Sequence, residues 1–463
     1  MEKIISLILI VIMLFGLVGC NKNDKESVAS IDFFETTSSI DNNTVTSSTL
    51  PKTTSTSNAT SKKSSTSKKS STSNKASTSK NIVTSQNSSS KSNKTSTVNT
   101  SSYNKPKIIP FSTSKKNIDL VKTTGRVTFE SGYGLSMLWT GSTIELNTTC
   151  QGDINICLSC KKGSESRLKI YVDGALFNEE ITTLTETTSL TVATELEYGV
   201  HNLRIVRSDD CEKGRISLTS IEIVGELSDK PADKKLYIKA LGGSQITGWG
   251  NLLSDTWFEN EFDRSVARDR KNQDGTLAYP MVAAELLDAD ISVLGRQGAG
   301  VALTWHESEN NGILEKLYSK TAPNINTPYT QTREADIIII DDGEIDINPS
   351  LYAKTGLKFS DITQKVTSFL TKLRSDHPNA KIIWCYGIDH DCQRRLLPEG
   401  KGGVALSSEE AITKILSQMG GELNGFFTLK MNYNPIRQGY PSVEEHKAAG
   451  ALLAEKINEI INR

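Results

Sequence analysis

The sequence predicts two folded domains, a β-sandwich followed by an α/β domain with a mainly parallel sheet, behind a long segment that does not fold. Short runs rich in Ile, Val, Leu and Thr, separated by turn residues, fill residues 107–228. Runs at this spacing without a helical period are typical of a β-sandwich. From residue 234 to residue 463, strand-like runs alternate with helix-like stretches, which indicates an α/β layer structure.

Residues 1–20 have the pattern of a secretory signal. Lys3 precedes an apolar run from Ile4 to Val18, which is short for a membrane span. The run ends in Leu17-Val18-Gly19-Cys20. This ending resembles a bacterial lipobox, which implies that Cys20 is the lipid-modified first residue of the mature protein. An uncleaved transmembrane anchor is the alternative, and in both cases we expect an extracellular domain tethered to a membrane.

Residues 21–106 are dominated by Ser, Thr, Lys and Asn, with almost no large apolar side chains. Such a segment cannot offset the entropy cost of ordering, so we expect a flexible stalk. No Asp or Glu occurs from Asn42 to Ile118, while lysines recur. The positive charge suits anionic wall polymers or lipid headgroups, and a solubilising spacer is the alternative. A nucleic-acid partner is not expected, because aromatic residues are not interleaved with the lysines.

The cysteines give no sign of a metal centre. Cys157 and Cys160 form a C-x-x-C pair, but no second pair of matching spacing and no nearby histidine accompany them. The pattern therefore does not predict a zinc site, and burial as small apolar side chains is the simpler interpretation. Export permits disulfides, whose pairing stays open. Nothing in the sequence calls for a metal or a cofactor.

The expected sandwich strands alternate polar and apolar residues, and Asp173-Gly174 follows one of them as a hairpin turn would. The strand runs are Arg126–Phe129, Ser142–Leu146, Asp153–Leu158, Arg167–Val172, Asn202–Val206 and Ile221–Val224.

The expected α/β domain begins after a polar connector, residues 226–233. The runs Ile337–Ile340 and Ile382–Trp384 are continuously apolar, as expected for parallel strands covered on both faces. In the last helix Ser442 and Glu445 have the spacing of a capping box. The expected strands are 236–240, 335–340 and 381–386, and the expected helices are 279–288, 361–374, 408–418 and 443–460.

A glycine-rich turn, Leu241 to Gly250, follows the first strand of the α/β domain. Glycines at this density allow a sharp turn that leaves one hydroxyl, that of Ser244, exposed at a strand end. In a hydrolase this serine would be the nucleophile. An ordinary turn rich in Gly, Ser and Thr is the alternative.

Several motifs follow one another from about Thr124 to Arg463. They are Gly125-Arg126, Trp139-Thr140-Gly141-Ser142, Tyr171-Val172-Asp173-Gly174, Gly199-Val200-His201, the Ser244 turn, Leu317-Tyr318-Ser319-Lys320-Thr321, Asp342-Gly343-Glu344-Ile345-Asp346 and Gly439-Tyr440-Pro441-Ser442-Val443-Glu444-Glu445-His446. Their order resembles carbohydrate esterase family 2, whose members join a jelly-roll domain to an SGNH (GDSL-type) hydrolase domain.

The resemblance implies removal of O-acetyl groups from plant cell-wall polysaccharides such as xylan and glucomannan. It places Ser244 at the position of the family's nucleophile. It also implies that a glycine of the 295–300 stretch supplies a backbone N–H to the oxyanion; the resemblance does not fix which one, and Gly298 is one candidate. Asp346, which ends the block beginning at Gly343, belongs to the same group of expected site residues.

The chain departs from the family at the positions that matter for catalysis. Ile345 stands where the family has an oxyanion asparagine, and loss of one such donor costs about a hundred- to a thousandfold in rate. Tyr440 stands in place of the catalytic histidine, and a phenol with an ordinary pKa near 10 is a poor base at neutral pH. Gly243 replaces the aspartate before the serine, and Arg437 and Gln438 occupy the neighbourhood of the histidine's acidic partner.

Three other histidines are weaker alternatives for the base. His446 matches a second family histidine at the start of the last helix, where a structural role is favoured. His390 lies between two aspartates after a strand, and His306 lies in a polar loop. Trp249 and Trp305 occupy Gly-rich or polar loops, so we expect them to bind sugar faces.

Two functions follow from these observations. The first is a surface-anchored carbohydrate O-acetyl esterase that uses Ser244, with a polysaccharide or oligosaccharide as partner. The second is a catalytically impaired pseudoenzyme that binds glycans at the cell surface. A structural or signalling lipoprotein that reuses the fold is a third alternative.

Overall fold

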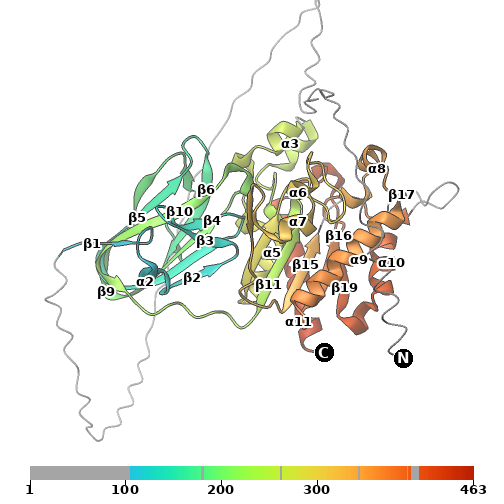
Figure 1. Cartoon of the computed structure of the whole chain (residues 1–463). Coiled ribbons are helices and arrows are strands. Elements are labelled where there is room, and N and C mark those ends of the chain that lie inside the picture. Colours follow the sequence, from blue (N-terminus) through green and yellow to red (C-terminus); the bar gives the residue numbers. More distant parts are fainter. Residues whose placement is uncertain (1–104, 179–181, 261–262, 342–344, 394, 398–405) are drawn as a thin grey trace, which may run out of the picture. The chain divides into compact units, whose positions relative to one another are not determined.

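The computed structural model describes residues 105–178, 182–260, 263–341, 345–393, 395–397 and 406–463 (Figure 1). The expected signal segment, Cys20 and nearly all of the expected stalk lie outside these residues, as do Gly343 and Glu344. Among the described residues, no helix has the length and apolarity to cross a membrane.

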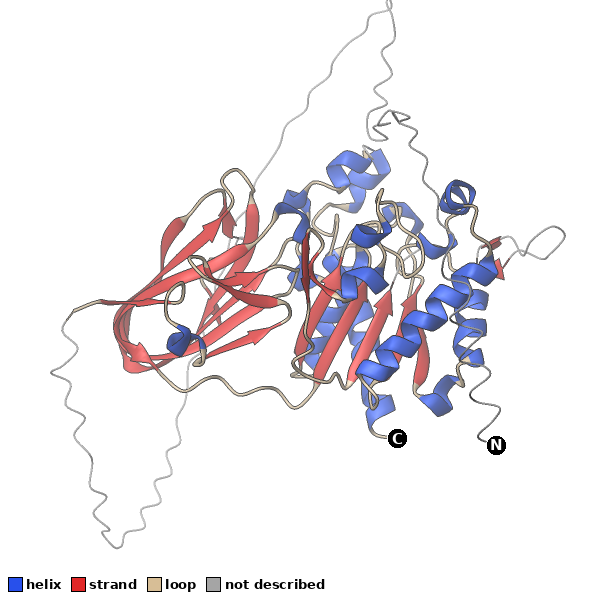
Figure 2. Ribbon diagram, viewed as in Figure 1, coloured by secondary structure: helices blue, strands red, loops and turns tan. Residues whose placement is uncertain are grey.

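The first domain is built from antiparallel strands (Figures 1 and 2). Ten strands pair in the order β3-β4-β10-β5-β9-β6-β7, with β1, β2 and β8 on side branches. The bounds are β1 Lys107–Pro110, β2 Val121–Thr124, β3 Val127–Glu130, β4 Gly134–Met137, β5 Thr143–Cys160, β6 Ser166–Val172, β7 Ala175–Leu176, β8 Thr182–Leu184, β9 Thr188–Arg207 and β10 Ile216–Leu227, with short helical turns α2 Lys115–Ile118 and η2 Cys211–Lys213.

The long strands β5 and β9 supply much of the core of this domain. Burial alternates along both halves of β5, because successive side chains of a strand point to opposite faces. The register between β5 and β9 shifts around Gly152, whose φ of 74° suits glycine. The buried apolar residues of β5 are Ile144, Leu146, Cys150, Ile154, Ile156 and Leu158.

The second domain has a five-stranded parallel sheet in the order β12-β11-β15-β16-β19 (Figure 2). The strand bounds are β11 Tyr237–Gly242, β12 Asp290–Gly295, β15 Ile337–Asp341, β16 Lys381–Tyr386 and β19 Phe426–Lys430. Two small antiparallel pairs accompany it, β13 Lys320–Ala322 with β14 Ile325–Pro328 and β17 Arg395–Leu397 with β18 Leu406–Ser407.

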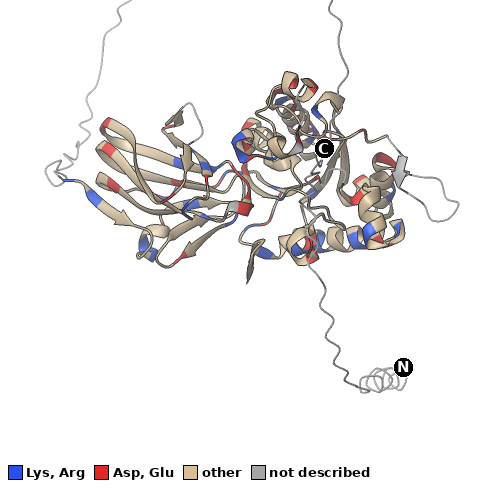
Figure 3. Cartoon of the chain, turned by 90° about the horizontal axis from the view of Figure 1, so that it is seen from above, with Lys and Arg blue, Asp and Glu red and all other residues tan. Residues whose placement is uncertain are grey.

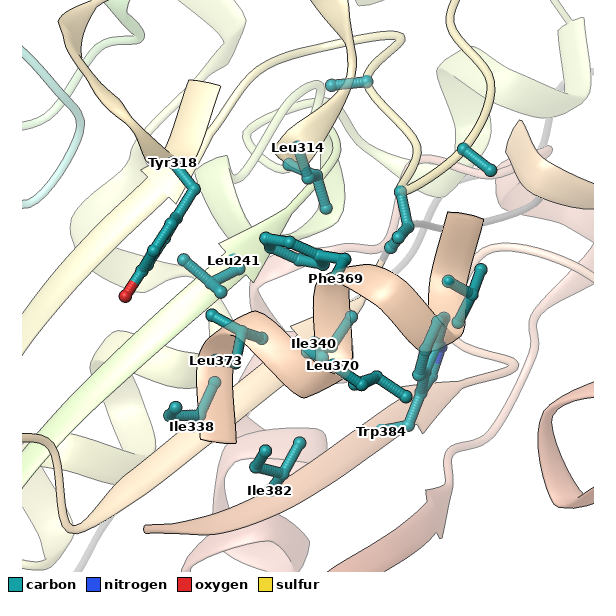
Figure 4. Packing of buried hydrophobic residues seen from close by; sticks show 14 of the residues in the cluster. Leu241, Leu314, Tyr318, Ile338, Ile340, Phe369, Leu370, Leu373, Ile382 and Trp384 are labelled. Atoms are coloured by element: carbon teal, nitrogen blue, oxygen red, sulfur yellow. The ribbon is translucent and has the colours of Figure 1, made fainter. Parts of the chain in front are cut away.

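Helices cover both faces of this sheet, as the continuous apolar runs predict. On one face α5 and α11 pack against Ile238, Ile339 and Ile383. On the other face Phe369, Leu370 and Leu373 of α9 pack against Ile338, Ile340 and Trp384 (Figure 4). The α-helices are α3 Asp255–Asn260, α4 Arg264–Ala267, α5 Tyr279–Leu286, α6 Glu309–Gly312, α7 Leu314–Tyr318, α8 Pro349–Thr355, α9 Phe359–Asp376, α10 Ser408–Gln418 and α11 Val443–Ile461.

The start of α11 confirms the predicted capping box. The Ser442 hydroxyl accepts a hydrogen bond from the backbone N–H of Glu445 at 3.2 Å, and the Glu445 carboxylate accepts from the backbone N–H of Ser442 at 2.6 Å. Gly450 then lets α11 approach α5 closely, because a Cβ there would lie 2.7 Å from the side chain of Val282. These contacts hold the segment between β19 and the C-terminus in place, and Tyr440 lies in this segment.

Buried polar contacts join the first domain to the second. The Arg126 guanidinium donates to the carbonyls of Leu317, Tyr318 and Lys320. The Trp139 indole N–H donates to the carbonyl of Thr321 at 2.7 Å. In the view of Figure 3, Lys and Arg are interspersed with Asp and Glu along the same elements.

Candidate functional site

Ser244 lies directly after β11, and its turn is held by its own carbonyl. That oxygen accepts hydrogen bonds from the backbone N–H of Thr247 at 3.2 Å, the Thr247 hydroxyl at 2.9 Å and the backbone N–H of Trp249 at 3.3 Å. Gly242 allows a close approach to β15, since a Cβ there would collide with the carbonyl of Asp341. The Ser244 side chain is half-buried, and its φ of −66° is that of an ordinary helical residue.

No histidine is hydrogen-bonded to Ser244. The chain has five histidines, and all five lie among the described residues. His201 bonds to Asp173 in the first domain, and His377 bonds to Tyr318 and to the backbone of Ala335. Across the described ranges, the Ser244 hydroxyl itself has no hydrogen-bond partner. The structure therefore gives this serine no base in place.

Tyr440, which the sequence resemblance places at the family histidine, lies in an apolar cluster. Its ring stacks on Phe258 with centroids 6.1 Å apart, and a Cβ at Gly250 would lie 3.0 Å from it. The Tyr440 hydroxyl accepts a hydrogen bond from Nε of Arg268 at 3.3 Å. The tyrosine therefore packs beside the far end of the serine turn.

Trp249 belongs to the same cluster and does not present a free face. It is 4% exposed and packs with Phe258, Ala267 and Tyr440. Its indole N–H has no partner among the described residues. The expected role in binding sugar requires an exposed ring, whereas the Trp249 ring is buried. The residues that cover the ring are distant in the sequence, so the local pattern does not predict the burial.

Arg437 is a residue of this region whose role the sequence did not suggest. It is 1% exposed and donates to the carbonyls of Leu253 at 2.6 Å, Gly250 at 3.0 Å and Tyr440 at 2.8 Å. One guanidinium thus ties the serine turn to the segment that carries Tyr440. The neighbouring Asp255 carboxylate lies 3.3 Å away.

The glycine stretch after β12 lies beside the end of β11, since the backbone N–H of Arg296 donates to the carbonyl of Gly242 at 3.1 Å. The Asp346 carboxylate holds in place the residues that follow this glycine stretch. Its carboxylate accepts from the backbone N–H groups of Val301 and Ala302 at 3.0 Å and of Leu303 at 2.7 Å. The structure thus gives Asp346 the role of orienting this loop.

Ile345 and Gly298 belong to the same loop system. A Cβ at Gly300 would lie 2.8 Å from the Ile345 side chain, so the two segments that the sequence mapping selects do lie together. Gly298 has a φ of 76°, and its carbonyl accepts from the Thr304 hydroxyl and from the backbone N–H of Trp305. Within the described part of the chain, the Gly298 N–H has no acceptor.

Trp305 packs next to Gly298 and is 41% exposed. A Cβ at Gly298 would lie 3.2 Å from that of Trp305. The neighbouring His306 is engaged, with Nε2 at 2.8 Å from the carbonyl of Gln297. Burial, helped by the charge of Arg296, lowers the pKa of His306 to about 4. His306 is therefore neutral at physiological pH, while Trp305 presents a face to solvent.

His446 is a core residue. Its ring is fully buried and nearly parallel to that of Tyr279, with centroids 6.3 Å apart. Its Nδ1 accepts a hydrogen bond from the backbone N–H of Tyr279 at 3.3 Å. Burial, with a contribution from Arg437, lowers the pKa of His446 to about 3. This agrees with the structural role favoured for it from the sequence.

His390 bonds to groups other than Ser244. Its Nδ1 lies 2.7 Å from Oδ1 of Asp389, and its Nε2 lies 2.8 Å from the hydroxyl of Ser408. The second carboxylate oxygen of Asp389 accepts from the side-chain amide of Gln245 at 2.7 Å. A chain of buried hydrogen bonds therefore runs from the residue after Ser244 to α10.

A metal centre finds no support in the described part of the molecule. Within it, no group of three or more His, Cys, Asp or Glu side chains is placed to hold a metal ion. Its six cysteines are all free thiols.

Comparison with known proteins identifies relatives for both domains. Residues 123–231 match the family described as carbohydrate esterase 2 N-terminal. The cellulase/esterase CelE of Acetivibrio thermocellus is 23% identical over 271 residues, which are 57% of this chain and 30% of that protein. The chain thus spans less than a third of the length of that relative.

Solved structures share the fold at low sequence identity. A family two carbohydrate esterase from Clostridium thermocellum, in complex with cellohexaose, has a TM-score of 0.62 at 18% identity and covers 74% of this chain and 99% of its own. An acetyl xylan esterase from Butyrivibrio proteoclasticus has a TM-score of 0.60 at 18% identity, with 77% and 99% covered. A family two carbohydrate esterase from Cellvibrio japonicus has a TM-score of 0.62 at 16% identity, with 77% and 98% covered.

Proposed function

The chain is a member of carbohydrate esterase family 2 by its N-terminal domain and its fold, and from this premise we propose that it binds glycans at the cell surface without conventional serine–histidine catalysis. The binding site would lie at the carboxyl edge of the parallel sheet, where Ser244 follows β11. Ligands of α/β proteins commonly bind at this edge.

One observation carries the loss of catalysis, namely that none of the five histidines is hydrogen-bonded to Ser244. Acyl transfer by a serine needs a base within hydrogen-bond reach. Tyr440 is bonded to Arg268 instead, and Ile345 offers no donor to an oxyanion. Neither Tyr440 nor Ile345 therefore supplies the catalytic group expected at its position, and this supports a binding role over catalysis.

Glycan binding is supported by Trp305. Its exposed indole lies beside Gly298 in the loop next to the serine turn, and a large aromatic face with a polar edge suits the apolar faces of sugar rings. A solved relative was captured with cellohexaose. We therefore propose a β-linked oligosaccharide or an acetylated plant polysaccharide as the ligand.

Titration calorimetry with cellohexaose and with acetylated xylan oligosaccharides tests the binding role. We expect Trp305→Ala to weaken binding at least tenfold, equivalent to about 1.4 kcal/mol. Trp249→Phe is the matched control, because it changes a buried ring and should leave affinity unchanged. Absence of binding, or affinity that survives Trp305→Ala, would remove the proposed site.

O-acetyl esterase activity is the second candidate function, and the position of Ser244 favours it. The serine follows a parallel strand, its hydroxyl has no competing partner among the described residues, and the unbonded N–H of Gly298 belongs to the neighbouring loop. An ester carbonyl held there would need an unconventional base.

We also propose the finer features of the fold. The antiparallel domain would be a jelly roll, and the domain with five parallel strands would be of the SGNH hydrolase type. The serine turn after β11 and the loop after β12, whose backbone N–H groups are bound by Asp346, support this assignment.

Surface attachment is proposed from Cys20 and the basic stalk. Metabolic labelling with a fatty acid should mark the wild-type chain and not Cys20→Ser, and labelling of both would contradict lipidation at this cysteine. If the stalk binds anionic wall polymers, cell-wall association should fall with added salt, because salt screens exposed charges.

A further inference from the structure

Three side chains outside the expected active site form a linear hydrogen-bonded set. The hydroxyl oxygen of Ser408 lies 2.8 Å from Nε2 of His390, and Nδ1 of His390 lies 2.7 Å from Oδ1 of Asp389. Asp389 and His390 follow β16, and Ser408 is the first residue of α10. Ser408 lies 18 positions after His390 in the sequence.

We propose that Ser408, His390 and Asp389 form a second serine–histidine–aspartate site, separate from Ser244, whose serine reacts with small acyl esters. Such a site is recognised by roles and geometry: a nucleophile within about 2.6–3.2 Å of a base, and a third group that orients the base. The two distances here meet that requirement. The proposal does not rest on glycan binding or on Ser244.

The hydrogen bonds of Asp389 indicate which ring nitrogen of His390 carries the proton. Oδ2 of Asp389 accepts from the amide of Gln245 at 2.7 Å, so both carboxylate oxygens face nitrogen. A carboxylate can only accept, which places a proton on Nδ1 of His390 and leaves the lone pair of Nε2 facing Ser408. The Ser408 hydroxyl has two acceptors within reach, Nε2 of His390 at 2.8 Å and the carbonyl of Cys392 at 3.2 Å, and the proposed reaction requires its proton to face Nε2.

A backbone donor is present at the same serine. The N–H of Ser408 lies at the start of the 11-residue helix α10 and has no acceptor among the described residues. The N–H of Glu409 is already used by the carbonyl of Cys392 at 3.2 Å. The positive end of the helix dipole favours negative charge, so the Ser408 N–H can donate to an oxyanion formed there.

Burial restricts the acyl group. Ser408 is 1% exposed, His390 6% and Asp389 7%, and the adjoining Cys392 is 4% exposed. A polysaccharide chain cannot follow an acyl group into such surroundings, so the proposal is confined to esters of small alcohols.

The reaction conserves atoms and charge. The Ser408 oxygen bonds to the ester carbonyl carbon while Nε2 of His390 takes the hydroxyl proton. The bond from that carbon to the alcohol oxygen then breaks, and the imidazolium returns the proton to the leaving alkoxide. Water, deprotonated by the same nitrogen, releases the acid and restores the serine.

Labelling with a short-chain alkyl fluorophosphonate, read by peptide mass mapping of the full chain, tests the proposal. The Ser408 oxygen would bond to phosphorus as fluoride leaves and the hydroxyl proton passes through His390 to solvent. We expect one adduct on Ser408 in the wild type and in Ser244→Ala. No adduct should form in Ser408→Ala, and the rate should fall at least a hundredfold in His390→Gln.

The rate of labelling against pH provides a measurement that needs no variant. In the folded wild type the rate should be lower at acid pH than at neutral pH, because a protonated imidazole cannot accept the hydroxyl proton. A pH-independent rate, an adduct on Ser244 alone, absence of an adduct, or equal labelling in His390→Gln would each overturn the proposal.

Discussion

The hydroxyl of Tyr440 accepts a hydrogen bond from Nε of Arg268 at 3.3 Å. The side chain that the sequence resemblance places at the family's catalytic histidine is therefore directed to Arg268, which follows α4. Its backbone is held as well, because Nε of Arg437 donates to the Tyr440 carbonyl at 2.8 Å. Tyr440 therefore contributes packing around the serine turn and is not placed as a base beside Ser244.

Restoring the two altered family residues should raise esterase activity. We expect Tyr440→His combined with Ile345→Asn to increase acetate release from a chromogenic acetate above that of the wild type. The imidazole would supply a base and the amide an oxyanion donor, and one such donor is worth about a hundred- to a thousandfold. Tyr440→Phe combined with Ile345→Leu is the matched control. If the two double variants are equally active, Ser244, Ile345 and Tyr440 do not form one site.

Burial of His446 should make stability depend on acid. Its pKa is about 3 in the folded protein against an ordinary 6.5, so below pH 6.5 only the unfolded chain binds this proton. The contribution is fully present above pH 6.5 and is lost as pH falls toward 3, by about 1.4 kcal/mol per pH unit. Urea unfolding of wild type and His446→Gln at pH 7.5, 6 and 5 measures it.

The expected result is that the wild type loses more stability than His446→Gln between pH 7.5 and pH 5. His201 is the control of opposite sign, since bonding to Asp173 raises its pKa despite partial burial. The stability that His201 contributes is present below its unfolded pKa and is lost as pH rises through its folded pKa. A His446→Gln curve parallel to that of the wild type would show that His446 is not held neutral.

Asp346 should stabilise the loop that carries Trp305. Asp346→Asn keeps the shape but replaces one accepting oxygen by a donor that faces backbone N–H groups. Each buried group left unsatisfied costs about 1–3 kcal/mol. We expect a loss of that size in urea unfolding, together with weaker glycan binding. Asp391→Asn, at an exposed carboxylate that caps one N–H, should change neither. Equal effects of the two substitutions would contradict the loop-holding role.

Arg126 should couple the unfolding of the two domains. Its guanidinium donates hydrogen bonds to three backbone carbonyls of the second domain. The Cζ atom of Arg126 lies 4.2 Å from the ring centroid of Tyr329. Arg126→Met would remove this donor, and each carbonyl left unsatisfied costs about 1–3 kcal/mol, although the Leu317 carbonyl keeps the backbone N–H of Ser319. We expect calorimetry to resolve two unfolding transitions in Arg126→Met and one in the wild type. A single transition in both proteins would show that other contacts suffice.

The sequence predicts the layers of the second domain well, because the parallel strands leave a strong local signal. Ile337–Ile340 and Ile382–Trp384 are apolar at every position, since helices cover both faces. It also places Ser244 at a strand end. In the first domain it divides β5 into two runs, because Gly152 resembles a turn residue. The structure continues one strand from Thr143 to Cys160 through a bulge there.

The candidate site is less predictable, because its properties depend on distant residues. Trp249 lies in a glycine-rich turn, and only the packing of Phe258 and Tyr440 buries it. His390 has carboxylates beside it in the sequence, but Ser408, which bonds to its ring, is 18 positions away with no local motif. Hydrogen bonds of this kind follow from the fold and not from any pattern along the chain.

Acetate release from acetylated xylan, measured for the full chain and for Ser244→Ala under the same conditions, tests the central claim most directly. The account predicts equal rates in the two proteins, because no histidine is bonded to Ser244 and Tyr440 is engaged by Arg268. A wild-type rate that Ser244→Ala reduces a hundredfold or more would contradict it and would establish Ser244 as a working nucleophile.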